Sequence, residues 1–162
     1  MPVTLLTPAH LIRIIEGINT RLEEFCLGEA SYDNTVLVAL ARHCPNLRVL
    51  ELVNENLDNE DRCIMNVYKQ CPLIEQLHIS INYAKSDDLI PELVEIATYC
   101  KNVHTLHFTQ SQYVQRRDVI NLVRNCKKLK LIQSNNSNLL KEMGRMYQGG
   151  KIEYLAPVEC AA

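Results

Sequence analysis

The sequence predicts an α/β fold in which strand–helix units repeat and stack on one another. The first observation is a nine-residue motif that occurs four times, as CPNLRVLEL, CPLIEQLHI, CKNVHTLHF and CKKLKLIQS. The second is the period-two spacing of apolar residues at the end of each copy, which is typical of a strand. The third is the three- and four-residue spacing of apolar residues before each cysteine, which is typical of a helix.

The four opening cysteines lie 27, 29 and 26 residues apart, and Asn19 takes the same position 25 residues before the first of them. Apolar residues recur at fixed distances after this position. Each copy therefore predicts one short strand whose apolar side chains face the core. Ser134 breaks the last column, and a weak sixth copy follows with Ile152 and Leu155. The predicted columns are Leu22, Leu47, Ile74, Val103 and Leu129; then Phe25, Leu50, Leu77, Leu106 and Ile132; then Leu27, Leu52, Ile79 and Phe108.

The predicted helices follow from spacing and from their capping residues. Residues 5–18 have helical spacing and are expected to cap the first unit. Pro91 fits the first turn of its helix, where a missing backbone N–H costs nothing. The end of the chain, residues 148–162, is expected to form a last short strand and a tail. Polar residues that can cap the remaining helices are Asp33 or Asn34, Asp58 or Asn59, Ser86 or Asp88, and Ser137.

The copies that begin at Cys44, Cys71 and Cys100 resemble the cysteine-containing leucine-rich repeats of F-box/leucine-rich-repeat proteins, and their period fits such repeats. The resemblance covers roughly residues 19–155. It implies a leucine-rich-repeat solenoid of about five to six repeats, with a curved parallel sheet on the concave face and helices on the convex face. This solenoid would form a single domain over residues 1–162, with residues 148–162 as the C-terminal cap and tail. The chain departs from the family in the turn after each strand, where only Asn82 fits, and it contains no full F-box.

Composition limits the classes of function. The 162 residues have a net charge of −2, which argues against a broad nucleic-acid-binding surface. No apolar run approaches the roughly 18 residues of a membrane span, and the N-terminus lacks the features of a secretory signal. Seven cysteines, four of them at one repeat position, favour reduced thiols in a cytoplasmic or nuclear protein. No cofactor motif is present, so we expect no cofactor.

The cysteine column is best interpreted as packing. Each cysteine precedes a strand, where the space is small and dry, and a buried thiol is a weak hydrogen-bond donor. Metal-binding cysteines usually come in close pairs, and the chain has no such CxxC pair.

The candidate site is a set of polar residues that lie between the apolar columns and face the concave side of the predicted sheet. His78 and His107 are expected to be neighbours, with Glu51 on the other side of His78. Two imidazoles and a carboxylate can bind zinc, but a solvated protein-binding surface is the simpler interpretation. The expected contact positions are Glu24, Glu51, Gln76, His78, Thr105, His107 and Gln133.

Two charged clusters are further candidates for functional residues. Arg116, Arg117 and Asp118 are expected to open a helix as solvated residues. Lys127, Lys128 and Lys130 form a basic cluster, either ordinary charged surface or a landing site for an acidic partner.

The leading hypothesis is a non-enzymatic module that binds a partner protein through the sheet face. The family resemblance implies a more specific role, as a substrate-receptor-like subunit of a ubiquitin ligase. One alternative is a structural subunit of a large assembly. A remote alternative is a metal-dependent enzyme using His78 and His107. We expect no catalytic residues, no bound metal, and no nucleic-acid or membrane partner.

Overall fold

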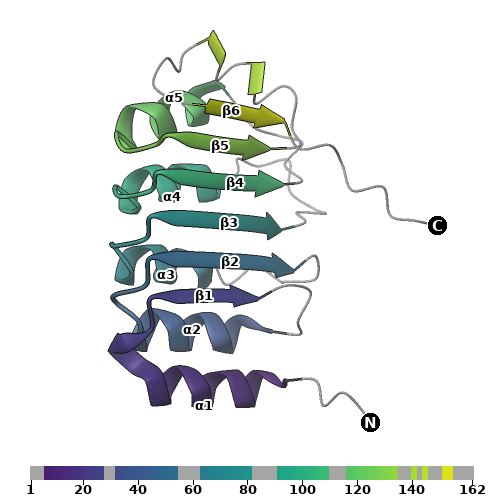
Figure 1. Ribbon diagram of the computed structural model, residues 1–162, viewed down its shortest axis with the longest axis vertical. Coiled ribbons are helices and arrows are strands. Elements are labelled where there is room, and N and C mark those ends of the chain that lie inside the picture. Colours follow the sequence, from purple (N-terminus) through teal and green to yellow (C-terminus); the bar gives the residue numbers. More distant parts are fainter. Residues whose placement is uncertain are drawn as a thin grey trace, which may run out of the picture.

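The computed structural model describes residues 6–27, 32–54, 63–81, 91–109, 116–134, 140–141, 144–145 and 151–154. Its strands form one parallel sheet in chain order (Figure 1): β1 (Glu24–Leu27), β2 (Val49–Asn54), β3 (Gln76–Ile81), β4 (Thr105–Thr109), β5 (Leu131–Ser134) and β6 (Lys151–Tyr154). Leu50 pairs with Leu77, and Leu77 pairs with Leu106, so the predicted register is confirmed.

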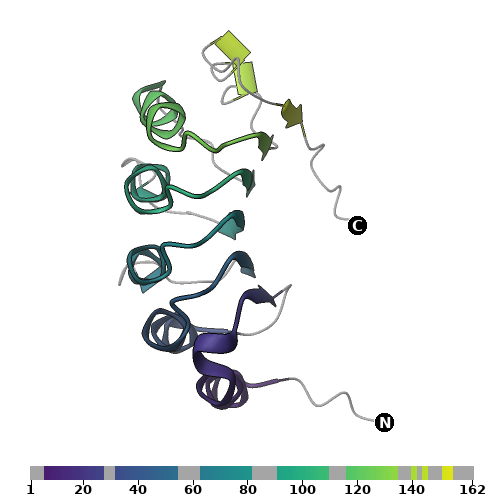
Figure 2. The same cartoon turned by 60° about the vertical axis from the view of Figure 1, so that its left-hand side comes forward.

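The helices of the described segments form a second layer on one side of the sheet (Figure 2). They are α1 (Pro8–Ile18), α2 (Asn34–His43), α3 (Cys63–Gln70), α4 (Pro91–Tyr99) and α5 (Arg116–Asn125), and a short 3₁₀ turn (Asn19–Arg21) follows α1. Each of α2 to α5 connects two neighbouring parallel strands, as a parallel sheet requires. The predicted α/β class with a parallel sheet is therefore confirmed.

The core lies between the two layers and is built from the predicted columns. Leu50, Leu77 and Leu106 are at most 1% exposed, as are Val36, Ile64 and most other helix residues that face them. Each buried side chain of this size contributes roughly 1.5–3 kcal/mol, so the repeated columns supply the main stabilisation. Ser134, which breaks the last column, is also fully buried beside Phe108 in the sheet.

The cysteine column ends each helix and turns the chain into the next strand. The amide N–H of Cys71 donates to the carbonyl of Val67, and the Cys71 carbonyl accepts from the amide of Ile74. Its thiol donates to the carbonyl of Cys44 in the preceding turn across 3.2 Å. Burial raises the pKa of Cys71 to about 12, so the sulfur keeps the proton that it donates. The thiols thus link successive turns, and the six cysteines in the described segments are all free.

Two helix starts show the predicted kind of capping. Asp33 accepts from the amide of Thr35 at the start of α2. The first helix begins at Pro8 rather than at residue 5, because Thr7 caps it: Thr7 Oγ1 accepts from the amide of His10, and His10 Nδ1 accepts from the amide of Thr7. Pro91 is the first residue of α4, as predicted. The other predicted caps lie outside the described residues.

One charge prediction is wrong. Arg117 is exposed as predicted, but Asp118 beside it is only 1% exposed, so it is a buried residue of α5 and not a solvated one. At the end of the chain, β6 pairs with β5 through Ile132 and Ile152, as the weak sixth copy predicts. The rest of the predicted cap and tail, including Leu155, lies outside the described residues. None of the helices in the described segments has the length and apolar character needed to cross a bilayer.

Candidate binding surface

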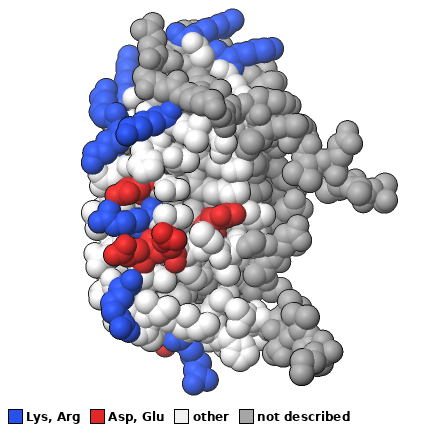
Figure 3. All heavy atoms as spheres, in the orientation of Figure 1, with Lys and Arg blue, Asp and Glu red and all other residues white. Residues whose placement is uncertain are grey.

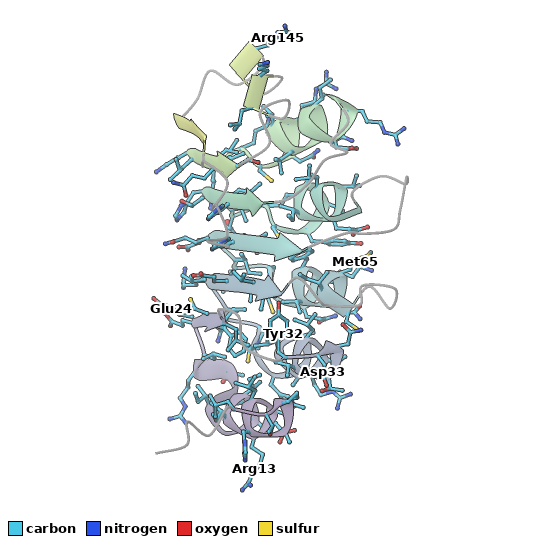
Figure 4. The ribbon with its side chains drawn as sticks, turned by 90° about the vertical axis from the view of Figure 1, so that its right-hand side faces the viewer. Arg13, Glu24, Tyr32, Asp33, Met65 and Arg145 are labelled. Carbon is cyan, nitrogen blue, oxygen red and sulfur yellow. The ribbon has the colours of Figure 1, made fainter. Side chains whose placement is uncertain are left out.

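The seven predicted contact residues all project from the face of the sheet that the helices do not cover, which we call the exposed sheet face. Strand register places them in two rows across the sheet: Glu24, Val49, Gln76, Thr105 and Leu131 in one, and Cys26, Glu51, His78, His107 and Gln133 in the other. Figure 4 shows the labelled Glu24 on the side of the strands away from the helices, whereas Asp33 and Met65 lie on the helix side.

The second row contains a contiguous polar cluster. The rings of His78 and His107 stack with 3.7 Å between their centroids and 9° between their planes. Glu51 Oε1 lies 3.2 Å from His78 Nδ1 on the other side. The side chains of His78 and Glu51 are 25% and 40% exposed, so the cluster is accessible but held by its neighbours. Adjacent strands are about 5 Å apart, so this arrangement fixes three polar groups along a line of roughly 10 Å.

Burial disfavours the protonated form of both imidazoles. It lowers the pKa of His78, although the Glu51 carboxylate acts in the opposite direction through its charge and hydrogen bond. Burial, and then the charge of His78, lower the pKa of His107 to about 4. Within the described part of the chain, His107 Nε2 is also buried without a hydrogen-bond partner.

The low pKa of His107 predicts a pH-dependent stability. In the unfolded chain the imidazole has a pKa near 6.5, so it is protonated at a pH where the folded His107 is still neutral. Stability is therefore complete above about pH 6.5 and is lost as the pH falls toward the folded pKa of about 4. Because the ring is only half-buried, we expect a loss of roughly 1 kcal/mol after solvent screening.

Urea unfolding at pH 7 and pH 4.5 measures this loss, and His107→Gln is the control for the carboxylates that titrate in the same interval. The wild type should lose roughly 1 kcal/mol more than the variant over this interval. Equal losses would show that His107 is not held neutral by its surroundings. If partner binding depends on the protonation of His107, we expect that dependence at acidic pH, near its pKa of about 4.

The remaining predicted contact residues differ in their solvent exposure. Glu24 and Gln76 are exposed, and Val49 separates them in the first row. Thr105 is half-buried, and its Oγ1 lies 3.0 Å from His104 Nδ1. Gln133 is half-buried beside His107 on β5. The exposed sheet face thus has a fixed centre at His78 and His107, and Glu24 and Gln76 are exposed to solvent on the same face.

The described residues do not form a metal or nucleophile site. Cys26 is two strands from His78, and partial burial together with Glu51 and Glu24 raises the pKa of its thiol. A thiol whose pKa is raised stays protonated, and a protonated thiol is a poor nucleophile. No group of three His, Cys, Asp or Glu side chains in the described segments is arranged to hold a metal ion.

A second charged feature was missed by the sequence analysis. It is a ladder of residues that immediately precede the strands: Arg48 forms an ion pair with Glu75, and His104 Nε2 lies 3.8 Å from the other Glu75 oxygen. Figure 3 shows basic and acidic side chains mixed along the lower and middle part of the edge where the strands begin, and basic side chains near its upper end. The alternating charges of Glu23, Arg48 and Glu75, each of which immediately precedes a strand, are the signal in the sequence that predicts the ion pair.

A scan against protein-family models finds no match to this chain, and a search of curated proteins finds no similar sequence.

Proposed function

We propose that this chain is a leucine-rich-repeat module that binds a partner protein through the exposed sheet face and has no catalytic activity of its own. The observation that carries the proposal is the contiguous row of Glu51, His78 and His107 on the face that no described helix covers. The repeated period and the cysteine column support the repeat type.

A surface of this kind suits macromolecular recognition. The strands fix the backbone, and the stacked rings and the Glu51–His78 contact fix the central side chains before a partner arrives. Little side-chain freedom is then lost on binding, which lowers the entropic cost of association. Imidazole rings can donate, accept and stack, and carboxylate and amide groups nearby add directional polar contacts.

The resemblance to F-box/leucine-rich-repeat proteins supports a narrower role, as a substrate-receptor-like subunit of a ubiquitin ligase. In that role the exposed sheet face holds the substrate. Co-purification with the adaptor subunit of such ligases tests this role separately from sheet-face binding. Partner binding through the sheet face without adaptor binding would leave the interaction module and remove the ligase role.

The double substitution His78→Ala and His107→Ala is expected to weaken partner binding at least about tenfold, because it removes the centre of the surface. Partners are identified by affinity capture and mass spectrometry, and the dissociation constant of each purified partner is then measured by calorimetry. The matched control is Asn66→Ala with Gln70→Ala, two exposed residues of α3 on the helix side. Glu24→Ala with Gln76→Ala tests the face again without altering the ring stack. Unchanged affinity in both sheet-face variants would contradict the proposal.

A further inference from the structure

The small net charge of this chain is the sum of two parts of the sequence with opposite net charge. Residues 1–100 contain 7 Lys or Arg and 15 Asp or Glu, a net charge of −8. Residues 101–162 contain 10 Lys or Arg and 4 Asp or Glu, a net charge of +6. Because the units follow one another in space in chain order, the N-terminal units come from the acidic part of the sequence and the C-terminal units from the basic part (Figure 1). In Figure 3, basic side chains predominate toward the C-terminal end, whereas acidic and basic side chains are mixed elsewhere on the visible face.

The basic side chains gather at two neighbouring turns, which lead from α4 into β4 and from α5 into β5. Lys101 Nζ lies 3.5 Å from Asn125 Oδ1, and Lys128 Nζ lies 2.6 Å from Asn102 Oδ1, so the two turns are joined directly. We call these exposed residues the basic edge: Lys101, Arg124, Lys127, Lys128 and Lys130.

The fold does not require lysine at these positions, as the earlier units show. The residues one, two and four places after the repeat cysteine are Pro, Asn and Arg after Cys44, and Pro, Leu and Glu after Cys71. After Cys126 all three are lysine. The same turn therefore forms with neutral, acidic or basic residues, so the demands of the turn do not explain the lysines.

Among the residues that the structure describes, no acidic residue forms an ion pair with the basic edge. Asp118 is the sole acidic residue between positions 101 and 134, and it is buried next to Arg117. Within the described segments, Lys127 and Lys130 form no ion pair or side-chain hydrogen bond. Concentrated like charge is unfavourable in the free protein, and a bound group of opposite charge relieves the repulsion.

We propose that the basic edge is a second binding surface, which takes an acidic segment of a partner protein. Residues 116–134 contain no aromatic residue, so this part of the edge lacks the stacking platform that single-stranded nucleic acids usually use. The net charge of −8 over residues 1–100 is also unfavourable for a long nucleic acid that extends beyond the edge. A short acidic peptide can stay within the basic edge, which spans two adjacent turns.

The test measures binding of a fluorescein-labelled oligo-glutamate peptide by fluorescence anisotropy at about 0.15 M salt, where the Debye length is about 8 Å. Lys127→Glu with Lys130→Glu should weaken binding by about tenfold, since it reverses two unpaired charges at the centre of the edge. The matched control is Arg13→Glu with Arg42→Glu, which changes the net charge equally at two exposed residues of the acidic part. This control should weaken binding less than about twofold, because α1 and α2 are several units away from the edge and exposed charges farther apart than about 8 Å are largely screened at this salt concentration. Circular dichroism confirms that each variant is folded.

Four outcomes would overturn the proposal. Equal loss of binding in both variants would indicate only a net-charge effect, and unchanged binding after the lysine substitutions would show that the peptide does not use the edge. Tighter binding of a DNA duplex than of the peptide would replace the acidic segment with nucleic acid. Concentration-dependent self-association that the lysine variant abolishes would assign the edge to a second copy of this chain. His78→Ala with His107→Ala should leave peptide binding unchanged, so failure here is distinguishable from failure of the sheet-face proposal.

Discussion

Leu77→Ala is expected to lower the free energy of unfolding by about 2–5 kcal/mol. Leu77 lies on the central strand β3, is 1% exposed, and pairs in register with Leu50 on one side and Leu106 on the other. Removal of its side chain leaves a cavity between two fully packed neighbours, and the rigid strands on both sides prevent it from collapsing.

Urea unfolding monitored by circular dichroism measures this loss. The midpoint should fall while the dependence on urea stays constant, because the same surface is exposed on unfolding. Val38→Ala is the matched control: Val38 is an apolar residue of α2 that is 38% exposed, so its truncation should cost less than about 0.5 kcal/mol. A loss below about 1 kcal/mol for Leu77→Ala would mean that the stacked columns are not the main source of stability.

The parts of the fold that the sequence predicted are those set by burial. A side-chain period of two allows only one register in which every apolar residue of a strand faces the core, so the pairing of Leu50 with Leu77 followed directly from the repeat spacing. The same reasoning placed His78 beside His107 and Glu51, because neighbours in the register are neighbours in space. The sequence was therefore sufficient to predict which positions lie on the exposed sheet face.

The details that the sequence did not predict depend on contacts between units. The stacking geometry of the two rings and the neutral state of His107 follow from burial by neighbouring strands, which spacing alone does not measure. The ion pair of Arg48 with Glu75 joins residues 27 positions apart that precede their strands. The start of α1 at Pro8 depends on a capping interaction between Thr7 and His10, and histidine is not a usual partner in such a cap.

The burial of Asp118 is the clearest departure from the sequence analysis. In the sequence it stands in a run with Arg116 and Arg117, and a charge run at a helix start usually points to solvent. The structure instead makes Asp118 the third residue of α5, with its side chain 1% exposed. A carboxylate in the first turn is stabilised by the free N–H groups and the positive end of the helix dipole, which offsets part of the cost of burial.

Asp118→Ala is therefore expected to lower the free energy of unfolding by about 1–3 kcal/mol, because it removes a buried carboxylate from the first turn, where the free N–H groups and the helix dipole favour negative charge. Arg117 Nε, 3.7 Å from Asp118 Oδ1, contributes little to this loss because the Arg117 side chain is 59% exposed. Asp118→Asn should cost less than alanine, since the amide oxygen still accepts hydrogen bonds.

The control is Asn121→Ala, an exposed position of the same helix, where the change should stay within about 0.5 kcal/mol. Measurements in low and high salt separate the two explanations for any loss. A buried carboxylate that accepts from the backbone should lose the same stability in both, whereas a surface ion pair with Arg117 would be screened. A loss for Asp118→Ala that disappears in high salt would show that the ion pair, and not the helix N-terminus, holds the buried carboxylate.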